Sequence, residues 1–211
     1  MKEIANRALA KVAMQLGYRP LEDTVSGFRG EVFMELRDGA SGKLIDKRHQ
    51  KNLIVKDFSV LLARLAKNNQ EPPKGLFCLA VGTGDIGWNP MAPPAPTNTQ
   101  RSLYAEISRK VFASTTFIDG AGIPVGIPTN VVDFTTTFTE SEAVGPLVEM
   151  GLLGGNISTN LAIKNPTLPP NGPYNPLTDL TLTESLGNYL TFAVLNKPPT
   201  ATLTITWRIQ F

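Results

Sequence analysis

The last twelve residues of the chain, TATLTITWRIQF at 200–211, alternate between two kinds of side chain. Threonine, arginine and glutamine take the even-numbered positions, and from 203 onward the odd-numbered positions are apolar: Leu203, Ile205, Trp207, Ile209 and Phe211. A period of two predicts a β-strand with one buried face and one face in water. Because an inward-facing aromatic residue closes this stretch, we expect the C-terminal strand to be held in a sheet, with Phe211 inside.

The same period near the N-terminus predicts a second half-buried strand at 28–37. Its inward face consists of four positions: Gly30, Val32, Met34 and Leu36. Turn-forming residues follow at 38–42, and 43–55 returns as a second strand. The three segments together predict a β-hairpin.

Further apolar or alternating segments predict more strands, at 76–81, 131–139, 145–155, 158–165 and 188–196. In 131–139 the side chains of Val132, Phe134 and Phe138 share the inward face. Residues 102–113 fit both a helix and a strand, and we favour a strand because β patterns lie on both sides.

Two segments have helical spacing instead. In residues 3–16, Ile4, Ala8 and Val12 recur at intervals of four. Residues 57–68 start at Asp57, a good N-cap, and place four side chains on one stripe: Phe58, Leu61, Leu62 and Leu65. The first helix is expected to form an arm over residues 1–20 that packs on its own domain or on a neighbouring subunit.

The composition agrees with a turn-rich β protein. The 211 residues include 17 prolines and 18 glycines, and only 18% are charged. Proline-rich loops are expected at 82–99 and 166–179. We therefore predict a mainly β chain, an antiparallel β-sandwich of jelly-roll or Ig-like type, with an N-terminal helix and one internal helix. Residues 21–211 form the single sandwich domain, including helix 57–68.

The stretch VGTGDIGW at 81–88 has the G-x-G-x-x-G spacing of a dinucleotide-binding loop. In such loops the third glycine starts a helix whose N-terminus holds the pyrophosphate. Here Gly87 is followed by WNPMAPPAPTN, and its four prolines do not permit that helix. We expect a strand exit through a turn with positive φ, and no nucleotide cofactor.

Side chains suited to catalysis are scattered. The only histidine, His49, lies in a basic hairpin, and the only cysteine, Cys78, lies in an apolar run and is expected in the core. Four carboxylates lie close in sequence and suggest the paired acids of a glycosidase: Asp133, Glu140, Glu142 and Glu149. The segment from 139 to 145 is more typical of a polar turn. We assign no catalytic, cofactor-binding or metal-binding residue and expect no enzyme.

The net charge of +2 does not favour nucleic acid as a main partner, and direct DNA contact is not expected. Residues 1–70 hold 13 Lys and Arg against 8 Asp and Glu, and the excess is concentrated at 43–56. That segment is either a solvated hairpin or a contact surface for an acidic neighbour. Neither a secretion signal nor a membrane-spanning stretch is recognisable, so synthesis in a cytoplasm is expected.

Three stretches in order resemble structural proteins of tailed bacteriophages: LAVGTGDIG followed by APTNTQRSLYAEISRK, then VVDFTTTFTESEAVGPLVEMGLLGG, then PPTATLTITWRIQF. The resemblance covers about residues 76–211. It implies a virion protein of the tail, baseplate, neck or fibre-attachment region that is made in the host cytoplasm. It also implies a symmetric homo-oligomer whose partners are other phage structural proteins and copies of itself.

Two alternatives remain open at this stage. One is a capsid decoration protein or a receptor-binding fibre module, and the other is a carbohydrate-active enzyme that uses the carboxylates named above. For docking, the favoured elements are loop 82–99, with Trp88 and Met91, and loop 166–179, with Tyr174. Proline-rich loops lose little entropy on binding. Trp88 is equally compatible with burial in the core.

Overall fold

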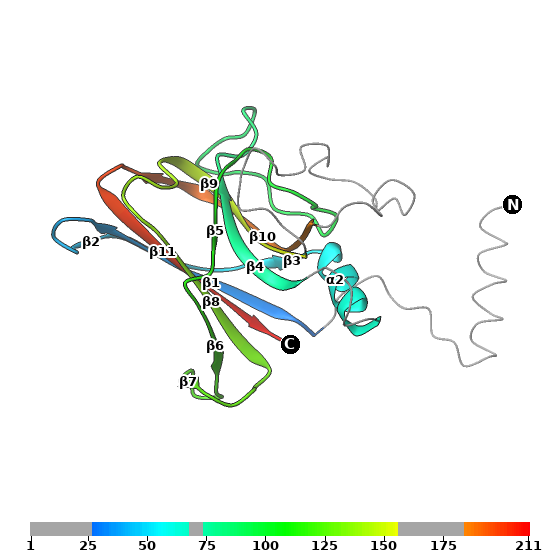
Figure 1. Ribbon diagram of the computed structural model, residues 1–211. Coiled ribbons are helices and arrows are strands. Elements are labelled where there is room, and N and C mark those ends of the chain that lie inside the picture. The colour runs from blue at the N-terminus through cyan, green and yellow to red at the C-terminus, as the bar shows by residue number, and fades with distance from the viewer. Residues whose placement is uncertain (1–26, 68–73, 156–183) are drawn as a thin grey trace, which may run out of the picture.

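In a computed structural model of the chain, residues 27–67, 74–155 and 184–211 are described. Within these ranges the chain is mainly β, with two antiparallel sheets and one helix (Figure 1). The predicted helix 3–16, the predicted strand 158–165 and loop 166–179 with Tyr174 lie outside the described residues.

The first sheet has six strands in the order β2-β1-β11-β8-β6-β7. In chain order these are β1 (Arg29–Asp38), β2 (Leu44–Lys51), β6 (Ser114–Ile118), β7 (Pro124–Val125), β8 (Val131–Phe138) and β11 (Ala201–Gln210). The strands β1 and β2 form the predicted hairpin, and the C-terminal strand β11 lies between β1 and β8.

The second sheet has five strands in the order β3-β10-β9-β4-β5. They are β3 (Leu53–Ile54), β4 (Lys74–Gly82), β5 (Glu106–Val111), β9 (Gly145–Gly155) and β10 (Glu184–Lys197). The return strand predicted at 43–55 is therefore divided, since β2 belongs to the first sheet and β3 to the second. The ambiguous segment 102–113 contains the strand β5, as favoured.

One core cluster joins the two sheets in a sandwich-like arrangement. It contains Met34 and Trp207 from the six-stranded sheet together with Met150 and Leu190 from the five-stranded sheet. The alternation predicted for β11 is confirmed at Leu203, Ile205, Trp207 and Ile209, each with no measurable exposure. It fails at Phe211, which follows the end of β11 and is 40% exposed.

The helix α2 (Lys56–Lys67) packs against the five-stranded sheet, and two glycines of that sheet allow the contact. A Cβ on Gly154 would lie 2.7 Å from Leu61, and one on Gly187 would lie 3.1 Å from Phe58. Phe58 and Leu61 are buried as predicted, whereas Leu65 is 37% exposed. The apolar stripe therefore leaves the sheet before the helix ends.

The prediction of Asp57 as the N-cap of this helix is wrong, because the helix begins one residue earlier than the predicted range 57–68. The helix begins at Lys56, so Asp57 lies in its first turn. Its carboxylate lies 3.5 Å from Nε of Arg101, and both side chains are buried. Asp57 therefore connects the start of α2 to the segment before β5.

The strands β6 and β7 were not predicted. They form a hairpin whose turn is held by the Asp119 carboxylate, because Oδ1 accepts the backbone N–H groups of Ala121 and Ile123. In Figure 1 this hairpin extends away from the rest of the two sheets. Glycines and prolines interrupt the alternation in this segment, which removes the period-two signal.

Candidate functional site

The residues between β4 and β5, 83–105, form a long loop over one side of the five-stranded sheet; it is called the 83–105 loop below. It contains the whole predicted loop 82–99 except Gly82, which is the last residue of β4. Beneath it lies Glu149 of β9, whose side chain has no measurable exposure. A buried carboxylate requires hydrogen-bond donors, and the loop supplies most of them.

Four donors converge on Glu149. Its Oε1 accepts the backbone N–H groups of Gly84 at 3.1 Å and Ala105 at 2.8 Å. Its Oε2 accepts the N–H of Tyr104 at 3.0 Å and the hydroxyl of Tyr189, on β10, at 2.5 Å. Both ends of the 83–105 loop are therefore fastened to one side chain of the sheet.

Tyr189 stays a phenol in this environment. Burial, and then the negative charge of Glu149, raise the pKa of Tyr189 far above its ordinary value of 10.0. The hydroxyl therefore acts as a donor to Glu149 throughout the neutral range. The pair belongs to a structural network of one carboxylate, one phenol and three backbone N–H groups.

The glycine motif is explained by the same carboxylate. At Gly82 a Cβ would lie 2.5 Å from Oε1 of Glu149 and 2.6 Å from the carbonyl oxygen of Ala105. Gly84 has φ +70°, and a Cβ there would meet Trp88 and Val148 at 2.5–2.7 Å. Among the three glycines of the motif, the predicted positive φ is thus present at Gly84 alone, and the N–H of Gly84 already donates to the Glu149 carboxylate.

The middle of the loop is fastened to β10. The carbonyl oxygen of Pro90 accepts the N–H of Val194 at 2.7 Å, and that of Pro94 accepts the Thr191 hydroxyl at 2.7 Å. Asn98 accepts the N–H of Lys56 at the start of α2. With four prolines and these contacts, the loop is held in one shape before it meets any partner.

The outer side of the loop carries exposed apolar side chains. Ile86 is fully exposed and Met91 is 67% exposed. Trp88 falls between the two expectations for it, because it is half-buried with its ring 4.6 Å from that of Tyr104 in an edge contact. The loop therefore presents Ile86 and Met91 to solvent, and Trp88 supports it from beneath.

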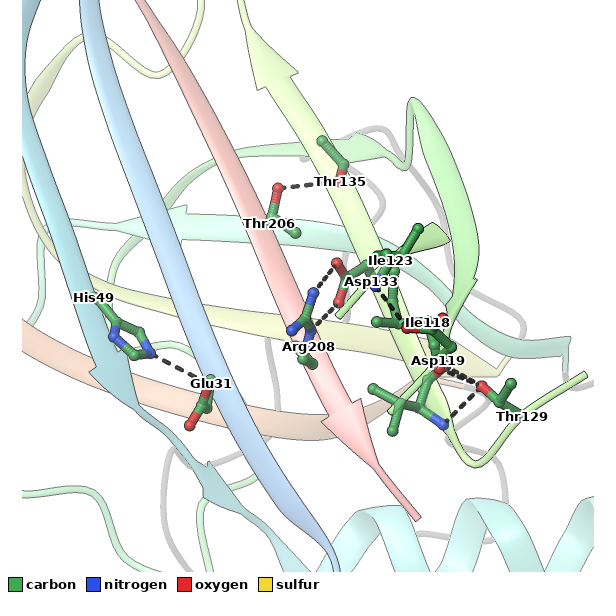
Figure 2. Close-up of polar contacts among 11 residues, drawn as sticks. Glu31, His49, Ile118, Asp119, Ile123, Thr129, Asp133, Thr135, Thr206 and Arg208 are labelled. Atoms are coloured by element: carbon green, nitrogen blue, oxygen red, sulfur yellow. Dashed lines mark hydrogen bonds and ion pairs between the residues drawn. The ribbon is translucent and has the colours of Figure 1, made fainter. Parts of the chain in front are cut away.

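The four carboxylates proposed as an acid pair do not come together. Asp133 binds Arg208 through two hydrogen bonds of 2.7 and 2.8 Å on the six-stranded sheet (Figure 2). Glu142 pairs with Lys110 at 2.6 Å and Glu149 is enclosed beneath the loop. Glu140 lies in the turn between β8 and β9, where its backbone carbonyl accepts the buried Lys197 ammonium at 3.2 Å.

Sequence reasoning missed a buried ionic cluster beside Cys78. The Arg109 guanidinium pairs with Glu106 and, at 2.6 Å, with Glu184. Burial opposes the charge on Arg109, but the two carboxylates outweigh it and raise the pKa of Arg109. Burial raises the pKa of Cys78 to about 12, so this core thiol is unreactive. The pairing joins residues 75 positions apart, which local spacing does not indicate.

The only histidine of the sequence makes contacts that suit a structural role. His49 stacks on Phe33 with ring centroids 4.3 Å apart, and its Nε2 lies 3.3 Å from Glu31. Among the described residues there is no group of three or more His, Cys, Asp or Glu side chains suited to a metal ion. In the same part of the chain, none of the helical segments has the length and hydropathy to span a membrane.

A pocket of 590 Å³ lies where the chain passes from the six-stranded to the five-stranded sheet. It is lined by apolar and charged residues of both signs: Phe28, Leu53, Ile54, Arg29, Glu31 and Lys51, together with Gly30 and Asn52. Asn52 packs over Gly30, where a Cβ would lie 1.9 Å from its Oδ1. Gly30 is therefore required by the crossing between sheets.

Comparison of the chain with protein-family models and with curated proteins gives no match.

Proposed function

We propose that this chain is a non-enzymatic structural component of a tailed bacteriophage virion. We place it in the tail, baseplate, neck or fibre-attachment region, where it assembles as a symmetric homo-oligomer with other phage structural proteins. We further propose that its two sheets form a sandwich of the jelly-roll or Ig-like type. The ordered resemblance over residues 76–211 supports this function.

The observation that carries the proposal is the form of the 83–105 loop. Its ends are bound to Glu149 and its middle to β10, while Ile86 and Met91 point outward. A loop fixed in this way loses little conformational entropy on docking. Burial of the Ile86 and Met91 side chains away from water then lowers the free energy of the complex. These are properties of an assembly contact between protein subunits.

Sedimentation of the purified full-length chain tests the proposal. The wild type is expected to form a discrete oligomer, and Ile86→Ser with Met91→Ser is expected to shift it to monomer because two exposed apolar contacts are lost. Unfolding of the double variant in urea should be unchanged, since neither side chain is buried. A stable wild-type monomer that also fails to join virion proteins would count against the proposal.

The β6–β7 hairpin offers a matched control. Ile123, in the turn of the hairpin, is 57% exposed, and Ile127, in the segment between β7 and β8, is 70% exposed, so Ile123→Ser with Ile127→Ser removes similar side chains from another surface. If only the loop variant dissociates the oligomer, the loop is the contact. Glycan degradation that is lost in Glu140→Gln with Glu142→Gln would instead favour the carbohydrate-active alternative.

A further inference from the structure

Within the described residues, the outer edge of strand β2 is free of a partner strand. β2 is the outermost strand of the six-stranded sheet, and it pairs with β1 alone over six consecutive positions, Asp46 to Lys51 (Figure 1). The segment Leu44–Lys51 contains no proline or glycine, so every residue carries a backbone N–H. Half of these N–H and C=O groups point away from β1, where no described strand pairs with them.

The outer face of this edge is basic. Lys47, His49 and Lys51 alternate along it, and their register partners on β1 are Glu35, Phe33 and Glu31. Lys47 pairs with Glu35 at 3.0 Å. Figure 2 shows His49 beside Glu31. The side chain of Lys51 makes no hydrogen bond or ion pair within the described residues. Two β1 carboxylates thus engage two of the three side chains and leave Lys51 unmatched.

The inner side of β2 is fixed to the other sheet. The Arg48 guanidinium is bonded to the Asp46 carboxylate, to the carbonyl oxygen of Val194 at 2.9 Å and to that of Ala193. Because Arg48 spans from β2 to β10, the edge strand is anchored from beneath. A rigid, extended edge is a template on which another strand adds at low entropic cost.

Charge determines which strand fits this template. A second copy of β2 laid against the first would place lysines beside lysines, and like charges directly opposite one another destabilise a sheet. A strand with Asp or Glu at alternate positions would instead place the Cβ of each acidic residue about 5 Å from the Cβ of Lys47, His49 or Lys51. Leu44 and Ile45, 42% and 54% exposed, provide apolar contact at the start of the edge.

We propose that the free edge of β2 binds an extended segment of another protein that carries Asp or Glu at every second position. The added strand extends the six-stranded sheet through backbone hydrogen bonds. Its carboxylates lie on the outer face beside Lys47, His49 and Lys51. This surface is separate from the 83–105 loop, so it provides a second contact with a different partner chemistry.

The test uses the full-length chain and a synthetic peptide, acetyl-Thr-Glu-Val-Glu-Val-Glu-Thr-amide. We expect binding by titration calorimetry or NMR, with new protection from hydrogen exchange at the outward-facing amides of β2. A peptide of the same composition with its three Glu in a block should bind at least about tenfold more weakly, because its carboxylates would alternate between the two faces.

Two variants test the role of charge. Lys51→Gln should weaken binding of the alternating peptide about threefold. Its control is Lys110→Gln, which removes the same charge from β5, the edge strand of the other sheet, and should leave binding unchanged. Lys47→Glu with Lys51→Glu should reverse the preference, so that the corresponding alternating Lys peptide binds and the Glu peptide does not. Circular dichroism checks that each variant folds.

Three results would overturn the proposal. The first is absence of binding at about 1 mM of the alternating peptide. The second is equal binding of the block peptide without amide protection in β2, which would indicate surface charge alone. The third is self-association of the chain through β2, which would identify a second copy as the occupant. None of these results depends on whether the 83–105 loop forms an assembly contact.

Discussion

Glu149 is the residue on which the polar contacts of the 83–105 loop converge. Gln in its place keeps one carbonyl acceptor but turns an amide N–H₂ toward backbone N–H groups that need an acceptor. We expect Glu149→Gln to lower the free energy of unfolding by about 2–5 kcal/mol, measured by urea denaturation.

Glu142 provides the matched control for this substitution. It was grouped with Glu149 by sequence, but its side chain is 37% exposed and pairs with Lys110. We expect Glu142→Gln to cost at most about 1 kcal/mol. Equal losses for the two variants would show that burial of Glu149 adds nothing to its contribution.

Cys78 and Tyr189 make the folded protein sensitive to alkaline pH. In the unfolded chain the pKa of a thiol is 9.0 and that of a phenol 10.0. Burial raises the pKa of Cys78 to about 12, and burial with the charge of Glu149 raises the pKa of Tyr189. Above pH 9 the unfolded chain therefore releases protons that the folded protein keeps. The stabilising contribution of the two groups is therefore fully present below that pH. The free energy of unfolding falls as the pH rises above it, by at most about 1.4 kcal/mol per pH unit for each group.

Urea midpoints between about pH 8 and pH 11 test this expectation. Cys78→Ala should flatten the decline that begins near the thiol pKa, and Tyr189→Phe the decline that begins near the phenol pKa. The quantity compared is the slope of the urea midpoint against pH. A loss of stability that is the same at every pH does not change this slope. A slope equal to that of the wild type in both variants would contradict the assignment.

At the scale of the element, the helix α2 contacts the sheet through the buried side chains Phe58 and Leu61. Leu61 lies over Gly154 with no measurable exposure, whereas Leu65 is 37% exposed. We expect Leu61→Ala to cost about 2–5 kcal/mol and Leu65→Ala less than about 1 kcal/mol. Thermal unfolding measures both losses. Equal losses in the two variants would instead indicate that the apolar stripe of α2 is buried along its whole length.

The element scale also shows where sequence patterns are reliable. The strands β1, β8 and β11 were predicted with their inward faces, because half-buried antiparallel strands alternate strictly. Nearly every residue of β9 is buried, so its sequence has no alternation from which to assign a face. The first turn of α2 was displaced by one residue because an acidic residue suits either the cap or the first turn.

At the scale of the whole molecule, the last strand of the chain is central in its sheet. β11 lies between β1 and β8, and its five fully buried side chains belong to the core cluster that joins the two sheets. Deletion of residues 201–211 should abolish the cooperative thermal transition, because β1 and β8 would lose their shared neighbour.

Deletion of Phe211 alone should cost only about 1–2 kcal/mol. Its exposed ring meets Phe28 at 5.5 Å and Phe58 at 6.0 Å, outside the sheet. A cooperative transition in the longer deletion would mean that the two sheets fold without β11. The pair of deletions therefore separates the contribution of the strand from that of its terminal ring.

The sequence by itself determined the class of the fold, the faces of the alternating strands and the presence of the internal helix. These features depend on the spacing at which apolar side chains recur, and residues close together in the sequence are enough to define that spacing. Tertiary structure alone decided that β2 and β3 enter different sheets, that β11 is internal, and that Glu149 holds the glycine turn. Those outcomes depend on pairing between residues far apart along the chain, such as Gly84 with Glu149 and Arg109 with Glu184, for which local spacing carries no signal.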